Sequence, residues 1–133
     1  MLALDIKKKL KEVFSKYDAI KVVYLFGSYA SNKNNKLSDI DLGILLDDNY
    51  DKNIKLSILA DLAEANLCNI DLVLLNEASL MLKFEIVKHN NIIYKRQDFD
   101  SAKYFSITVR KYLDFEPFIE VQRRYFKERL LNG

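Results

Sequence analysis

Two short stretches decide the fold: IKVVYLFGS at residues 20–28 and DIDLGILL at residues 39–46. Each contains a run of β-branched, aromatic and aliphatic side chains of strand length, and Gly27-Ser28 ends the first run. The second stretch opens with polar and apolar residues in alternation and continues as a buried run. Between them, residues 31–38 are almost all polar, which indicates a loop. We therefore expect two strands joined by a polar loop.

The rest of the chain alternates between helical and strand patterns. Apolar residues recur at helical spacing in residues 2–17, 52–66 and 78–89, and short apolar runs at residues 70–75 and 91–95 predict two more strands, the last at a sheet edge. This order predicts an α/β (α+β) fold, in which helices pack on a small mixed β-sheet. A chain of 133 residues has the length of one compact domain, so we expect residues 1–133 to form a single domain.

Residues 97–133 are expected to form a C-terminal helical segment. Because proline interrupts helices, we expect one helix to about Leu113, a turn at residues 114–117 and a second helix to Leu131. The aromatic residues of this segment are predicted to pack on the sheet, and a protein-binding surface is the alternative. They are Tyr104, Phe105, Tyr112, Phe115, Phe118, Tyr125 and Phe126.

The amino-acid composition limits the kinds of catalytic and binding site that this chain can form. The single cysteine, Cys68, excludes a disulfide framework and a cysteine-based zinc site, and we expect it to be a small core residue. One histidine leaves little for histidine-zinc or Ser-His-Asp chemistry, so carboxylates and hydroxyls must carry any catalysis. A net charge of +2 is no electrostatic footprint for nucleic acid. No segment resembles a signal peptide or a membrane span, so we expect a cytoplasmic protein.

A pair of acidic residues opens the second predicted strand. Residues two apart in a strand point to the same face, so Asp39 and Asp41 would lie side by side. Adjacent carboxylates repel unless a cation neutralises them, and oxygen ligands suit Mg²⁺ or Mn²⁺. Ordinary solvent-side alternation is the alternative interpretation of this pattern.

A third acid and a glycine-serine pair complete the set. If the strand at residues 70–75 lies beside residues 39–46, Asp71 can join Asp39 and Asp41, and three carboxylates on one sheet face suggest a two-metal site for displacement at phosphorus. Gly27 would let the backbone approach a phosphate, and Ser28 and its neighbours would donate hydrogen bonds. Alone, Asp71 could be a strand-edge residue and Gly27-Ser28 a simple turn.

Gly-Ser, ten residues and Asp-x-Asp resemble the signature of the nucleotidyltransferase superfamily related to DNA polymerase beta. With Asp71 and the small size, the chain is similar to the minimal nucleotidyltransferase (MNT) antitoxins that pair with HEPN-domain toxins. The resemblance implies that Asp39, Asp41 and Asp71 are catalytic residues that ligate two Mg²⁺ ions, with Asp71 placed to take a proton. It also implies that Gly27 and Ser28 bind the β- and γ-phosphates of ATP.

The resemblance further implies a Mg²⁺-dependent protein adenylyltransferase, an AMPylating antitoxin. It would transfer AMP from ATP to a tyrosine of a cognate HEPN RNase toxin, release pyrophosphate and form a hetero-oligomer with the toxin. The alternative is an antitoxin that occludes its toxin by binding alone. Transfer to a small molecule is a weaker alternative, because the chain has no second domain to form such a pocket. Gly43 could leave room beside the nucleotide, or it could serve simple packing.

Overall fold

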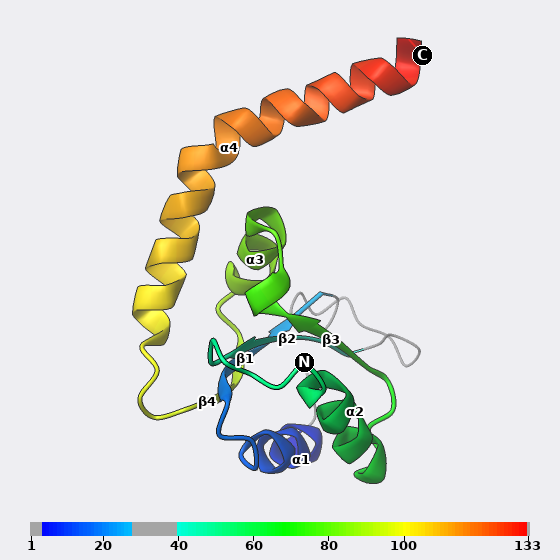
Figure 1. Cartoon of the computed structure of the whole chain (residues 1–133), viewed down its shortest axis with the longest axis vertical. Helices are drawn as coiled ribbons and strands as arrows, with labels where there is room; N and C mark the ends of the chain where they lie inside the picture. Colours follow the sequence, from blue (N-terminus) through cyan, green and yellow to red (C-terminus); the bar gives the residue numbers. More distant parts are fainter. Residues whose placement is uncertain (1–3, 28–39, 133) are drawn as a thin grey trace.

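The computed structural model describes residues 4–27 and 40–132, with helices and strands close to those expected (Figure 1). The elements are α1 (Leu4–Phe14), β1 (Ile20–Phe26), β2 (Ile40–Leu46), α2 (Ile54–Glu64), β3 (Ile70–Leu74), the 3₁₀ turn η1 (Leu75–Glu77), α3 (Leu80–Val87), β4 (Ile92–Lys95) and α4 (Ser101–Asn132). The predicted mixed α/β architecture is confirmed. The turn η1 was not expected from the sequence.

The four strands form one mixed sheet in the order β3-β2-β1-β4. β1 pairs with β2 and with β4 in antiparallel fashion, whereas β2 and β3 are parallel. A parallel pair needs a crossover, and α2 supplies it between β2 and β3. The predicted edge position of residues 91–95 is confirmed, since β4 ends the sheet.

Helices cover both faces of the sheet. The apolar sides of α1 and α2 pack with Leu42, Ile44 and other strand residues in the larger buried cluster. The side chains that alternate with these strand residues point to the other face, where Tyr24 and Leu45 pack near Ile86 of α3. Figure 1 shows the two layers, with α1 and α2 below the sheet and α3 and α4 above it.

The C-terminal segment differs from the expectation. It is one continuous helix, with Pro117 inside it, rather than two helices separated by a turn. Proline removes one backbone donor and crowds the carbonyl four residues earlier, here that of Leu113, which bends a helix without necessarily ending it. Both residues are exposed, so water can satisfy the freed carbonyl. Figure 1 shows the resulting bend in the orange part of α4.

The predicted packing of the aromatic residues is right for one half of α4 and wrong for the other. Before the bend, the ring of Tyr104 lies 6.4 Å from that of Tyr24 on the sheet, and Tyr112 stacks on Phe84 of α3 at 3.9 Å. Beyond Tyr112, the aromatic rings whose exposure the structure describes face solvent; they are Phe115, Phe118 and Tyr125. The sequence pattern does not separate these halves, because the bend decides which part can reach the sheet.

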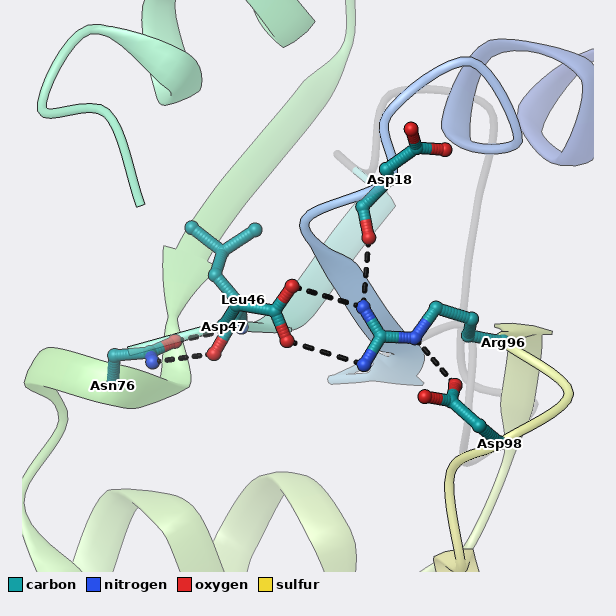
Figure 2. A network of polar contacts seen from close by, with 6 residues as sticks. All are labelled: Asp18, Leu46, Asp47, Asn76, Arg96 and Asp98. Carbon is teal, nitrogen blue, oxygen red and sulfur yellow. Dashed lines mark hydrogen bonds and ion pairs between the residues drawn. The ribbon is translucent and has the colours of Figure 1, made fainter. Parts of the chain in front are cut away.

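An arginine joins three strand ends on the side of the sheet away from the start of β2. The Arg96 guanidinium donates to both carboxylate oxygens of Asp47 at 3.0 and 3.1 Å and to the Asp18 carbonyl at 2.7 Å (Figure 2). These hydrogen bonds to Arg96 hold the pKa of Asp47 below its usual range. The Asn76 side chain donates to and accepts from the backbone of Leu46, which joins η1 to the end of β2.

Two further expectations concern exposure and the membrane. Cys68 is exposed, so its predicted place in the core is wrong; it lies in the connection that precedes β3, outside both buried clusters. In the part of the chain that the structure describes, no helix is both long enough and apolar enough to span a membrane.

Candidate active site

Two of the three predicted acids lie side by side. β2 and β3 are parallel, and Asp41 is the register partner of Asp71. Neighbouring strands are about 4.8 Å apart, and residues directly opposite each other point to the same face. That face is the one covered by α3 and α4, because Leu42 and Leu72, which alternate with the two acids, belong to the opposite cluster. The predicted pairing of the Asp71 strand beside residues 39–46 is confirmed.

The two carboxylates differ in their surroundings. Asp41 is partly buried on an inner strand, whereas Asp71 is exposed on the edge strand β3. Two like charges this close repel unless a cation lies between them, and carboxylate oxygens are the donors that Mg²⁺ prefers. The donor set therefore fits a divalent metal ion. The exposed Asp71 is also accessible from solvent.

Gly27 touches the first of these acids. It follows β1 with a φ of +73°, a conformation that side chains rarely adopt. A Cβ atom at this position would lie 2.2 Å from Oδ2 of Asp41. The backbone at Gly27 can therefore lie against the Asp41 carboxylate only because glycine has no side chain. The two halves of the sequence signature meet at this contact, beside the pairing of Phe26 with Asp41.

Of the two roles that the sequence left open for Gly43, the structure supports packing. A Cβ atom at Gly43 would lie 2.6 Å from Cγ2 of Ile86, so the side chain of Ile86 fills the space above this glycine. Ile86, which the sequence reasoning missed, therefore bounds the site on the α3 side. The helix that carries Ile86 is capped at its start by Ser79, whose hydroxyl accepts a hydrogen bond from the backbone N–H of Leu82 at 3.2 Å. A glycine inside a strand was the available signal for this close approach.

The remaining predicted site residues, Ser28 and Asp39, lie outside the described residues. Within residues 4–27 and 40–132, no three or more His, Cys, Asp or Glu side chains are placed to hold a metal together. The described part of the site is therefore the pair Asp41 and Asp71 with Gly27 beside it.

Comparison of the sequence with models of protein families gives a match that covers most of the chain. A family model described as polymerase beta, nucleotidyltransferase matches residues 8–99. The chain belongs to this nucleotidyltransferase family. The match begins inside α1 and ends before α4, so the whole sheet, α2, α3 and residues 8–14 of α1 lie within the family region, whereas α4 is additional to it.

Individual proteins of known sequence or structure are also similar to this chain. The chain is 30% identical over 100 residues to the protein adenylyltransferase MntA of Shewanella oneidensis, an alignment that covers 75% of this chain and 72% of the relative. A solved toxin–antitoxin structure with AMP-PNP has the same fold, with a TM-score of 0.72, 22% identity and coverage of 94% of this chain and 98% of that chain. The MNT antitoxin in complex with the tri-AMPylated HEPN toxin of S. oneidensis gives a TM-score of 0.66 at 21% identity, with 94% and 95% covered. These two likenesses establish the fold and extend over most of α4.

Proposed function

We propose that this nucleotidyltransferase is an AMPylating antitoxin, which transfers AMP from ATP to a tyrosine of a HEPN-type RNase toxin and thereby inactivates it. The observation that carries the proposal is the pairing of Asp41 with Asp71, with Gly27 against Asp41, in a chain homologous to protein adenylyltransferase MntA. The reaction consumes ATP and acts on an RNase, so we place the protein in the cytoplasm. We treat residues 1–133 as one functional domain.

Each residue of the site would have its own role in the reaction. Asp39, Asp41 and Asp71 would hold two Mg²⁺ ions, which supply charge neutralisation for the triphosphate and lower the pKa of the acceptor hydroxyl. Gly27 and Ser28 would hold the β- and γ-phosphates, where a backbone without a side chain admits close approach. The acceptor oxygen forms a bond to the α-phosphorus, the bond from that phosphorus to the bridging oxygen breaks, and pyrophosphate leaves. Asp71, which is exposed, would accept the hydroxyl proton.

The test is transfer of label from α-labelled ATP to the purified toxin in the presence of Mg²⁺. We expect labelling by the native protein, loss of at least about a hundredfold in Asp41→Asn and Asp71→Asn, and pyrophosphate in equal amount to the transferred AMP. Asp61→Asn is a matched control, since Asp61 lies on α2 at the opposite face of the sheet. Absence of label on the toxin would contradict the proposal. So would labelling by the two Asn variants that equals labelling by the native protein.

A second function, occlusion of the toxin by binding alone, is favoured by the exposed apolar residues of α4. Growth of cells that express the toxin separates the two functions. Under the first, the Asp41→Asn/Asp71→Asn variant fails to protect the cells although it still binds the toxin. Under the second, the variant protects as well as the native protein.

A further inference from the structure

Two tyrosine hydroxyl groups are buried between α4 and the sheet. Tyr24 of β1 is fully buried, and the ring of Tyr104, near the start of α4, lies beside it with the centroids 6.4 Å apart. Within residues 4–27 and 40–132, neither hydroxyl oxygen has a hydrogen-bond partner, and both oxygens are shielded from solvent. We call these two residues the buried tyrosine pair. A buried hydroxyl group without a partner destabilises a fold, so the pair indicates that something else satisfies both groups.

A third hydroxyl group belongs to the same interface. Among the residues that the structure describes, Thr108 is the one buried side chain that is neither aliphatic nor aromatic. It follows Tyr104 by four residues, so the two side chains lie on the same face of α4. Burial raises the pKa of Tyr104, and the neighbouring Thr108 hydroxyl partly offsets this rise. Both α4 and β1 thus contribute hydroxyl groups to the surface where they meet.

The chemistry of this interface excludes an ion as the partner of the hydroxyls. Burial raises the pKa of Tyr24, and the nearby Tyr104 raises it further, so both tyrosines keep their protons near pH 7. No charged side chain in the described part of the chain is buried, so nothing here compensates the desolvation of a charged ligand. A tyrosine hydroxyl both donates and accepts hydrogen bonds. The buried tyrosine pair therefore fits a neutral molecule that also does both.

Water is the molecule of this class that protein interiors commonly hold. A buried water makes about three hydrogen bonds, which matches the number of hydroxyl groups at this interface. Because solvent reaches neither tyrosine oxygen, the bound molecule must also be small enough to be enclosed. Buried spaces that stay dry are lined by apolar groups, whereas this one is lined by hydroxyls.

We propose that a water molecule is bound between α4 and the sheet, where it forms hydrogen bonds with the hydroxyls of Tyr24 and Tyr104 and helps to hold α4 in place. Because α4 lies outside the family region, this contact joins the additional helix to the domain. Tyr24 is the register partner of Gly43, two residues beyond Asp41. The bound water thus fixes the first half of α4 on the face of the sheet that carries Asp41 and Asp71. Its role is structural and independent of AMP transfer.

A crystal structure of the native full chain, at a resolution that shows ordered water, tests the binding directly. We expect a water oxygen about 2.8 Å from the hydroxyl oxygens of both Tyr24 and Tyr104. In the Tyr24→Phe/Tyr104→Phe variant, which keeps both rings, this water should be absent. Tyrosine oxygens that bond directly to each other or to another protein group would overturn the proposal. So would a native crystal structure with no water beside them.

Urea denaturation tests whether the water stabilises the fold. Tyr24→Phe and Tyr104→Phe should each raise the unfolding equilibrium constant about fivefold, because each removes one hydrogen bond to the water. The double variant should raise it by less than the product of the two, since a water that has lost one partner is bound less well. Tyr112→Phe is the matched control on the same helix: its ring stacks on Phe84, its hydroxyl is outside the buried tyrosine pair, and the constant should change less than about twofold. Single variants of the pair that are as stable as the native protein, or more stable, would overturn the proposal, because the hydroxyls would then have no partner to lose.

Discussion

The backbone of Gly27 lies against the carboxylate of Asp41 so closely that a Cβ atom there would be 2.2 Å from Oδ2. This contact joins the end of β1 to the start of β2, next to the register pair Phe26 and Asp41. The positive φ of +73° at Gly27 adds a second reason for glycine at this position. One residue thus sets both the path of the chain leaving β1 and the place of an acid in the site.

Gly27→Ala is expected to reduce AMP transfer by at least about a hundredfold, because the added methyl group must displace the Asp41 side chain from its place beside Asp71. The free energy of unfolding should fall by about 1–2 kcal/mol, the usual cost of a positive φ outside glycine. Kinetics with labelled ATP and urea denaturation measure the two effects. Equal transfer by the variant and the native protein would show that the contact does not position Asp41.

Gly43→Ala should destabilise the protein through the α3 contact. The new Cβ would meet Cγ2 of Ile86 at 2.6 Å, so α3 or the Ile86 side chain must move, at a cost of about 1–3 kcal/mol. Ile86→Ala should itself cost about 2–5 kcal/mol, because Ile86 is fully buried. The Gly43→Ala/Ile86→Ala variant should nevertheless lose less than the sum of the two single losses, which a double-mutant cycle of unfolding free energies from urea denaturation measures as coupling. Strictly additive effects of the two substitutions would mean that the two residues do not compete for the same space.

The sequence predicts the strands and the edge position of β4, because strand patterns are local signals. The joining of Asp71 with Asp41 follows from the sequence only on the condition that their strands lie side by side, and the structure meets that condition. Sequence reasoning failed where geometry between distant segments decides. Gly43 meets Ile86 of α3, which is more than forty positions away, and no local pattern shows which helix covers a strand. Pro117 signalled a break, but an exposed proline in a long helix causes a bend when water can satisfy the freed carbonyl. Cys68 was misplaced because its type favours burial while its position is a surface connection.

The ion pair between Arg96 and Asp47 predicts a dependence of stability on pH. Hydrogen bonds from Arg96 lower the pKa of Asp47 in the folded state, so this pair stabilises the fold above the ordinary pKa near 3.8 and the stabilisation is lost as the pH falls through the lower folded value. Both side chains are partly exposed, so the contribution at pH 7 should stay below about 1 kcal/mol. Urea denaturation of the native protein and of Asp47→Asn should differ at pH 7 and converge below about pH 4. Asp48→Asn, at the exposed neighbouring position, is the control and should follow the native protein.

Pro117→Ala tests whether the proline causes the bend in α4. Alanine restores an N–H donor that can bond to the Leu113 carbonyl, so α4 should straighten and the free energy of unfolding should rise or stay the same. Straightening should also separate Arg123 from Met81 of α3, whose sulfur lies 2.9 Å from Nη2 of Arg123 in the bent helix. Distances between spin labels at positions 81 and 123 measure the change in the helix, and urea denaturation measures the change in stability. An unchanged distance between the two labels would show that contacts other than the proline hold the bend.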